Sequence, residues 1–241
     1  MSIYEPLNLR GKIAVVTGGS RGIGRAVAEA LVRDGVKTAV CGRDSASLAQ
    51  AVQDLSAGGE VSGRTCDMGR YEQVEEFFRF VEETYGGLDI LINNAGVGRF
   101  APVDQLSVED WREVIDVNLS GPFYALKSAV PLMRRRGGGF IINIGSLAGK
   151  NPFAGGAAYN ASKFGLNGFS EAAMMDLRHE GIRVSQIMPG SVQTEFTPGG
   201  AEGDWKLDPA QIAETVLHLL RMPDRNLASR VEMRPSRPPR K

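Results

Sequence analysis

Cysteine and histidine are scarce in this chain, with two of each among 241 residues. Cys41 and Cys66 each end a short apolar run, and in a reducing compartment we interpret them as small buried hydrophobic residues. A redox pair would require the two runs to be neighbouring strands, and no Cys-x-x-Cys spacing supports it. His179 and His218 lie within helical patterns, away from any motif that would complete a metal site. We therefore expect no metal.

Net charge and long apolar runs are also lacking. Lys plus Arg and Asp plus Glu both total 28, so no whole-molecule field would attract nucleic acid or a membrane surface. No apolar run approaches the ~20 residues of a membrane span, and residues 1–12 have no apolar core of the kind that a signal peptide needs. We expect a cytoplasmic protein without nucleic-acid or membrane partners.

Short apolar runs alternate with amphipathic segments through the rest of the sequence. Apolar residues make up 42% and charged residues 23%, as in an ordinary globular protein. Strands are predicted at residues 12–17, 38–41, 61–66, 88–93, 140–144, 183–188 and 229–233. Helices are predicted at residues 25–34, 45–55, 71–85, 107–136, 157–180 and 209–220. This order predicts a doubly wound α/β fold, in which a parallel sheet carries helices on both faces, in one domain spanning residues 1–241.

Three glycines, Gly18, Gly22 and Gly24, stand between the first predicted strand and the first helix. Missing side chains let the backbone turn sharply and bring its N–H groups against a pyrophosphate at the start of the helix. The spacing Gly-x-x-x-Gly-x-Gly departs from the common dinucleotide fingerprint, and any tight strand-to-helix turn enriches glycine. Because the run directly follows a buried strand, we interpret it as a nucleotide cradle.

Several motifs follow one another in order: Thr17-Gly18-x-x-x-Gly22-Ile23-Gly24, Asn93-Asn94-Ala95-Gly96, Ser146, Tyr159-x-x-x-Lys163 and Pro189-Gly190. In this combination the sequence resembles the short-chain dehydrogenase/reductase family, in its short form, from about residue 10 to residue 233. The resemblance implies a Rossmann-type, three-layer α/β/α fold. It also implies an oxidoreductase that interconverts a carbonyl and a secondary alcohol by hydride transfer.

The end of the second strand bears on which nicotinamide cofactor binds. An acid there would hold the ribose 2′-hydroxyl, whereas this strand ends in Gly42 and Arg43, and Arg21 lies in the glycine loop. Two guanidinium groups suit a 2′-phosphate, so we predict NADP(H); the alternative is that both arginines are merely solvated. The resemblance assigns cofactor binding to Gly18, Ser20, Arg21, Gly22, Ile23, Gly24, Arg43, Asp67, Asn94, Tyr159, Lys163, Pro189, Gly190 and Thr194. For Asp67, capping the next turn is an alternative role, and Asn94 is expected to be partly structural.

Tyr159 and Lys163 lie four residues apart, on one face of a predicted helix. A free phenol has a pKa near ~10, and a nearby ammonium favours the phenolate, so Lys163 is expected to make Tyr159 a competent general acid and base. The resemblance implies that Ser146 hydrogen-bonds the substrate carbonyl, and that Asn118 bends its helix and holds a water joined to Lys163. The predicted catalytic residues are therefore Asn118, Ser146, Tyr159 and Lys163.

The substrate is less well defined by the residues. The pocket is expected from residues 97–100, 147–153 and 191–205, and residues 194–207 form a glycine-rich flap. Within the flap, Phe196 and Trp205 either contact an apolar substrate or pin the flap to the body. The first candidate is a 3-oxoacyl thioester, as in the acyl-carrier-protein reductases that the chain resembles. Residues 134–136, three consecutive arginines, would dock an acidic carrier protein or simply complement the dipole of their helix.

Two departures weaken the carrier-protein interpretation. Glu180 stands where a basic docking residue is expected, and a basic, proline-rich tail at residues 234–241 replaces the usual ending. We expect that tail in solvent or along a neighbouring subunit. The alternatives are a reductase of small ketones, sugars or other secondary alcohols and, more remotely, a non-catalytic NADP-binding sensor. The resemblance also implies a homotetramer assembled through residues 108–136 and 157–180.

Overall fold

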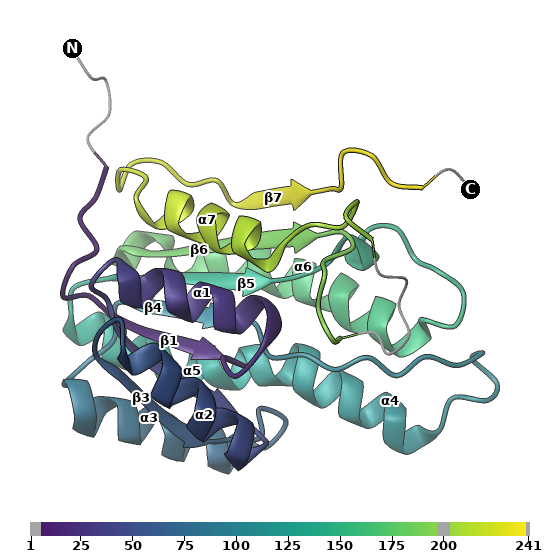
Figure 1. Ribbon diagram of the computed structural model, residues 1–241, viewed down its shortest axis with the longest axis horizontal. Coiled ribbons are helices and arrows are strands. Elements are labelled where there is room, and N and C mark those ends of the chain that lie inside the picture. Colours follow the sequence, from purple (N-terminus) through teal and green to yellow (C-terminus); the bar gives the residue numbers. More distant parts are fainter. Residues whose placement is uncertain (1–5, 197–202, 240–241) are drawn as a thin grey trace.

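The computed structural model describes residues 6–196 and 203–239 of the chain (Figure 1). Its strands are β1 (Ile13–Thr17), β2 (Lys37–Gly42), β3 (Val61–Thr65), β4 (Ile90–Asn93), β5 (Gly139–Ile144), β6 (Ile182–Pro189) and β7 (Arg230–Met233). Its helices are α1 (Gly22–Arg33), α2 (Ser45–Ser56), α3 (Tyr71–Tyr85), α4 (Val108–Ile115), α5 (Gly121–Arg135), α6 (Ala157–Leu177) and α7 (Pro209–Leu220). Short helices are η1 (Asp116–Ser120), η2 (Leu147–Gly149) and η3 (Arg178–Glu180). Each predicted strand and helix is present, with shifts of a few residues at the ends.

All seven strands lie in one sheet in the order β3-β2-β1-β4-β5-β6-β7, and every neighbouring pair is parallel. The order reverses between β1 and β4, where Val15 pairs with Leu91. Loops leave the carboxyl ends of these two strands toward opposite faces, which opens a crevice at this edge of the sheet. The predicted doubly wound parallel fold is confirmed.

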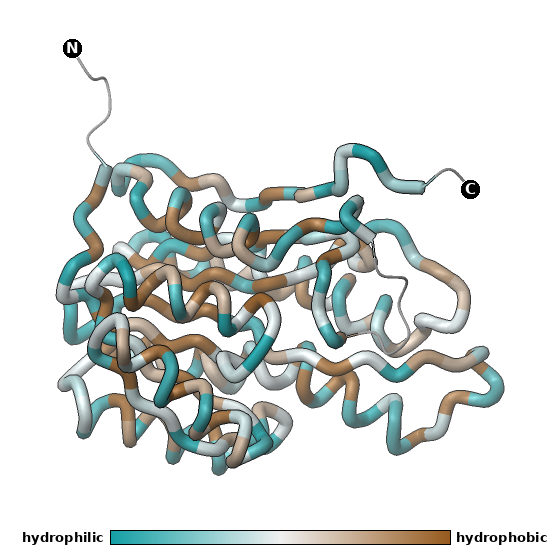
Figure 2. The backbone as a smooth tube through the Cα atoms, viewed as in Figure 1, coloured by the Kyte–Doolittle hydropathy of each residue, from teal (hydrophilic) through white to brown (hydrophobic). Residues whose placement is uncertain are grey.

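Helices cover both faces of the sheet (Figure 1). Successive strand residues point to opposite faces, so Val16 packs in one buried cluster with Leu31 of α1 and Val216 of α7, whereas Val15 packs in the other with Phe77 of α3. Figure 2 shows the corresponding hydrophobic colour running through the central strands. None of the helices within the described residues combines the length and apolar character that crossing a membrane demands.

The single helix predicted at residues 107–136 is interrupted. Ser107 caps it as expected, because its Oγ accepts a hydrogen bond from the N–H of Asp110 at 3.0 Å. At Asp116–Ser120 the chain then makes a π-helical turn, η1, between α4 and α5. Such turns insert an extra residue and are frequent at functional sites. Here the turn contains Asn118, which is 1% exposed.

Candidate active site

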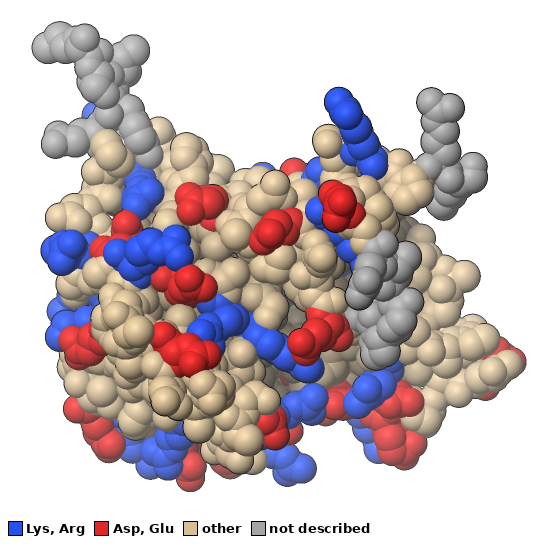
Figure 3. Space-filling view, viewed as in Figure 1, with Lys and Arg blue, Asp and Glu red and all other residues tan. Residues whose placement is uncertain are grey.

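A cavity of about 1070 Å³ opens at the carboxyl ends of the strands. Its walls come from the glycine loop, the ends of β2 to β6, the start of α6, the flap and the C-terminal tail. The predicted site residues that line it are Gly18, Ser20, Arg21, Gly22, Ile23, Arg43, Asp67, Asn94, Ser146, Tyr159, Lys163, Pro189, Gly190 and Thr194. Gly24 and Asn118 do not line it. Acidic and basic side chains are interspersed over this face of the molecule, without a large patch of one sign (Figure 3).

The glycine loop has the geometry that its three glycines were predicted to allow. Gly18 and Gly22 have φ values of +65° and +56°, a region in which side chains other than glycine are strained. A Cβ at Gly24 would lie 2.3 Å from both the Gly18 oxygen and Asn94 Nδ2. Gly24 therefore does not line the cavity; its missing side chain lets α1 pack closely against the glycine loop.

Asn94 holds the two central strand ends together. Its Nδ2 donates to the carbonyl oxygens of Thr17 at 2.9 Å and Gly18 at 3.1 Å. In return, the backbone N–H groups of Asn94 and Ala95 donate to Thr17 Oγ1, each at 3.0 Å. The structural role expected for this asparagine is therefore present at the base of the crevice.

Tyr159 and Lys163 project from α6 into the cavity. Lys163 is 5% exposed; its Nζ lies 5.6 Å from the centre of the Tyr159 ring and donates to the Ile144 carbonyl oxygen at 3.1 Å. Burial lowers the pKa of Lys163 to about 8. Burial also raises the pKa of Tyr159, which a hydrogen bond with Ser146 partly offsets. Burial is the larger of these two effects on the pKa of Tyr159, and the expected lowering of that pKa by Lys163 stays a prediction.

The other two predicted catalytic residues differ in their placement. Ser146 begins η2, where its Oγ accepts from the N–H of Ala148 at 3.1 Å, and it stays in reach of Tyr159. Asn118 lies beneath the wall: its Oδ1 accepts from the N–H of Val97 at 2.8 Å, and its Nδ2 donates to the Val97 oxygen at 2.9 Å. Nδ2 also lies 3.2 Å from Ser162 Oγ, so Asn118 reaches the neighbour of Lys163 in sequence.

The two arginines predicted to bind a 2′-phosphate both line the cavity, and both are ion-paired. Arg43 Nη1 lies 2.8 Å from Glu113, and Arg21 Nη1 lies 3.3 Å from Glu195. Neither carboxylate was predicted to be there, because each is far from its arginine in sequence. The hydrogen bond from Arg43 is the main reason that the pKa of Glu113 lies below its ordinary value. The guanidinium groups are thus exposed cations held by acids that an incoming phosphate would have to displace.

An acid near the end of β2 was also missed. Asp44 lines the cavity, although the sequence was interpreted as having no acid at this strand end. Its side chain accepts from the N–H of Ser47 at 2.7 Å and caps α2. Hydrogen bonds from the Ser47 side chain and then from its backbone N–H lower the pKa of Asp44. The Asp-x-x-Ser pattern before a helix was the available signal. Asp67 behaves similarly: Oδ1 accepts from the N–H of Gly69 at 3.0 Å, which is the turn-capping alternative.

The substrate end of the cavity is aromatic. Phe100, Phe153 and Phe196 line it around Tyr159, and Trp205 contributes from the flap. Residues 197–202 of the predicted flap lie outside the described residues. The tail is mostly exposed, as the solvent alternative predicts, and three of its residues, Arg234, Pro235 and Pro238, also line the cavity.

The two cysteines are buried neighbours on the sheet. Cys41 of β2 and Cys66, which directly follows β3, lie 3.7 Å and 3.9 Å from Met68 Sδ, and both thiols are free. Hydrogen bonding with Cys66, followed by burial, raises the pKa of Cys41. A thiol with a raised pKa is a poor nucleophile, which favours the interpretation of both as packing residues. Within residues 6–196 and 203–239 no group of acids, histidines and cysteines is arranged to hold a metal ion.

Known proteins match this chain over most of its length. The family model described as short chain dehydrogenase matches residues 12–203. An uncharacterized oxidoreductase of Staphylococcus saprophyticus is 34% identical over 235 residues, which is 95% of this chain and 99% of the relative. The structure of a metagenomic short-chain oxidoreductase in complex with NADP is 38% identical with a TM-score of 0.85, covering 96% of this chain and 100% of that one. An alcohol dehydrogenase from the archaeon Thermococcus sibiricus, complexed with 5-hydroxy-NADP, is 32% identical with a TM-score of 0.88 and the same coverage.

Proposed function

The chain belongs to the short-chain dehydrogenase family, and from that premise we propose that it is an NADP(H)-dependent reductase of ketones. The observation that carries the proposal is the meeting of Tyr159, Ser146 and Lys163 in the same cavity as the glycine loop. The glycine loop that would bind the nucleotide and the residues that would transfer the proton thus line the same cavity. The two similar structures that contain NADP or 5-hydroxy-NADP support the choice of cofactor.

The residues present fit a dinucleotide phosphate. Gly18 and Gly22 take the backbone conformation that a close approach to a pyrophosphate requires, at the N-terminus of α1, where the helix dipole favours an anion. Arg21 and Arg43 would hold the 2′-phosphate, and Asp44 is committed to capping α2. When bound, the cofactor supplies or accepts the hydride.

Tyr159 would act as the proton donor to the carbonyl oxygen. Because its pKa is raised, Tyr159 is protonated at neutral pH and ready to give up a proton once negative charge develops on the substrate oxygen. Ser146, already hydrogen-bonded to Tyr159, would share that oxygen. Lys163, with a pKa of about 8, is mostly charged at pH 7 and stabilises the phenolate that remains. In the oxidative direction the same groups run in reverse.

A free ketone is supported over a carrier-bound 3-oxoacyl thioester. The three arginines predicted to dock an acidic carrier are all paired within the chain. Arg134 lies 2.5 Å from Glu180, Arg135 contacts Glu82, and Arg136 lies 3.1 Å from Asp89. Each arginine thus has an acid beside it, so the cluster is not a patch of positive charge alone and gives only weak support to an acidic carrier. This favours the small-ketone alternative of the sequence analysis.

A homotetramer is part of the same proposal. Helices α4 to α6 carry large apolar side chains that are 41–57% exposed in the single chain: Val108, Trp111, Phe123, Phe164 and Met175. Exposed apolar surface of this kind is typical of interfaces. Light scattering on the purified protein would measure the mass directly, and a monomer at micromolar concentration would contradict the assembly.

The test of the function is NADPH consumption by purified protein with acetoacetyl-CoA and with simple ketones. Tyr159→Phe should lower kcat about 100-fold or more, because it removes the proton donor. Tyr124→Phe, on α5 and outside the cavity lining, is the matched control and should retain activity. Turnover of the thioester alone would restore the 3-oxoacyl alternative. Tight NADPH binding without turnover of any carbonyl would point to the sensor.

A further inference from the structure

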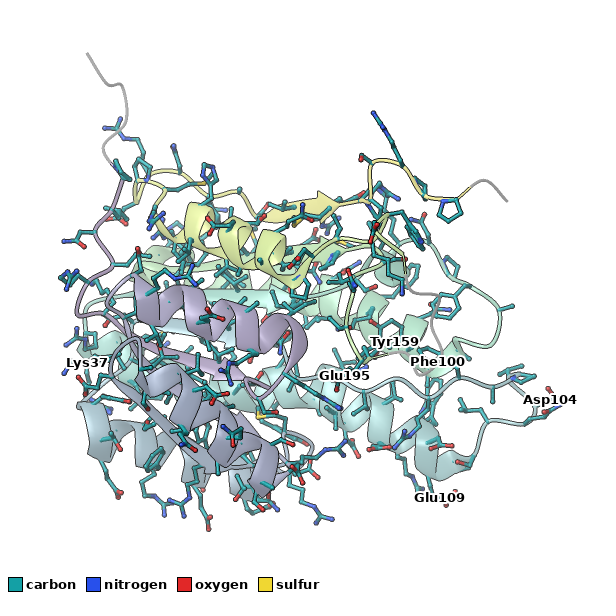
Figure 4. All side chains as sticks on the ribbon, in the orientation of Figure 1. Lys37, Phe100, Asp104, Glu109, Tyr159 and Glu195 are labelled. Carbon is teal, nitrogen blue, oxygen red and sulfur yellow. The ribbon has the colours of Figure 1, made fainter. Side chains whose placement is uncertain are left out.

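Three phenylalanines from three separate segments surround the Tyr159 ring. The centre of that ring lies 5.8 Å from that of Phe100, 6.4 Å from that of Phe153 and 5.6 Å from that of Phe196. Phe100 follows β4, Phe153 precedes α6 and Phe196 follows β6, and all three line the cavity. Figure 4 shows Phe100 beside Tyr159. The wall around the proposed proton donor is therefore built by tertiary packing of aromatic rings.

These rings face the cavity without being buried. Phe100 is 43% exposed, Phe153 46% and Phe196 38%. Large apolar side chains gathered at one place and left exposed are a sign of a ligand-binding surface, because a ligand that covers them removes apolar area from water. Their spacing around Tyr159 puts that ligand surface next to the reacting carbonyl.

Glycines hold the rings in these positions. A Cβ at Gly98 would lie 2.6 Å from the Phe100 ring and 3.2 Å from the Phe196 ring. A Cβ at Gly156 would lie 2.6 Å from the Phe153 ring. Since each ring lies directly over a glycine, a side chain at either glycine would push the rings apart. The aromatic arrangement is thus specified by packing.

Ring orientation and charge indicate what this wall would bind. The planes of the three phenylalanines make angles of 65°, 48° and 52° with the Tyr159 ring, so all three are tilted against it, as aromatic pairs prefer. An aromatic ring gains more from such surroundings than a saturated ring of the same size. Among the described residues, the charged group recorded over the Tyr159 ring is Lys163. The three side chains of the aromatic wall carry no charge, so an uncharged substituent fits against them.

We propose that Phe100, Phe153 and Phe196 form the specificity pocket of the enzyme and select ketones that carry an uncharged aromatic ring close to the carbonyl. The pocket lies between Phe196, which follows β6, and the loop after β4, next to Tyr159. This inference rests on the proposed function, since it assumes that the carbonyl meets Tyr159.

The probes are 4-phenyl-2-butanone and 4-cyclohexyl-2-butanone, which share the carbonyl and the linker and differ in whether the ring is aromatic. In the unchanged protein, kcat/KM should favour the phenyl compound by several-fold. Phe100→Leu, Phe153→Leu and Phe196→Leu should each lower that ratio by about 2- to 13-fold, the range expected for one aromatic pair. Phe80→Leu is the matched control, because Phe80 is partly exposed on α3, away from the proposed interface, and does not line the cavity.

Equal kcat/KM values for the two ketones in the unchanged protein would overturn the aryl pocket and leave the ketone reductase standing. A ratio that all three cavity variants leave unchanged would overturn it as well. Calorimetric titration of 4-phenyl-2-butanone into NADP⁺-saturated protein separates the two proposals. Binding that weakens in Phe100→Leu, without turnover of any ketone, would refute the reductase and support the pocket. Since the unchanged protein already compares the two ketones, a variant that fails to fold does not decide the outcome.

Discussion

Replacing Lys163 with methionine is expected to stabilise the folded protein while abolishing turnover. Lys163 is 5% exposed, and burial lowers its pKa from 10.5 to about 8. At about 1.36 kcal/mol per pH unit, this difference means that the charged side chain costs the folded state about 3 kcal/mol at pH 7. Methionine is unbranched, of similar length and uncharged, so Lys163→Met removes that cost with little change in packing.

The sign of the pH dependence follows from the lowered pKa. Below pH 8 the lysine is charged in both the folded and the unfolded chain, and the full cost is present. Between pH 8 and 10.5 the unfolded chain holds a proton that the folded chain has released, so the free energy of unfolding of the unchanged protein rises with pH. The advantage of Lys163→Met should therefore shrink from about 3 kcal/mol at pH 7 to about 1.4 kcal/mol at pH 9.5.

Urea unfolding without cofactor, followed by tryptophan fluorescence at both pH values, measures this difference. Lys127→Met, an exposed lysine on α5, is the control and should change the free energy of unfolding by less than about 0.5 kcal/mol. The reasoning is refuted if Lys163→Met is no more stable than the unchanged protein at pH 7. An equal difference in the free energy of unfolding between Lys163→Met and the unchanged protein at pH 9.5 would also refute it, because the lysine charge would then not cause that difference.

Three further predictions concern the cofactor loop and the tail. Arg43→Leu should weaken NADPH binding by about 10-fold or more, because one charge-assisted contact with the 2′-phosphate is lost, and should leave NADH binding unchanged. Equal weakening of NADPH and NADH binding would show that Arg43 does not contact the 2′-phosphate. Gly24→Ala should destabilise the protein by about 1–3 kcal/mol in thermal unfolding, because its Cβ would clash at 2.3 Å. Gly168→Ala, with no atom within 4 Å of the added Cβ, should be neutral or stabilising, and similar losses in both would contradict the packing explanation. Ending the chain at Met233 removes the lining residues Arg234, Pro235 and Pro238 and should raise KM for the ketone about 5-fold, with NADPH affinity unchanged in fluorescence titration. An unchanged KM would place the tail outside the substrate site.

Local pattern was sufficient for the fold. Apolar runs predicted the central strands β1, β2, β4, β5 and β6, because strands buried on both faces of a parallel sheet have few polar positions. The edge strands β3 and β7 are partly exposed and carry more polar residues. The capped starts of α4 at Ser107 and α7 at Asp208 were equally readable, since capping depends on residues within one turn. The π-helical conformation of η1 could not be predicted from local pattern, because the residues around Asn118 have an ordinary helical sequence.

The features of the candidate site also differ in whether they depend on nearby or on distant residues. By itself, the sequence determined the glycine loop, the placement of Tyr159 and Lys163 on one helical face, and the position of Ser146 after a strand, because each depends on residues that are close in the chain. Tertiary structure alone decided that Glu113 pairs with Arg43, that Glu195 pairs with Arg21, and that the tail joins the cavity. The three phenylalanines come from segments that the sequence already assigned to the pocket, and the tertiary structure gathered their rings around Tyr159. It also buried Tyr159, which raises the pKa of that phenol. Local dihedral preferences and hydrophobic periodicity act over a few residues, whereas contacts and desolvation depend on which distant segments the whole sheet brings together.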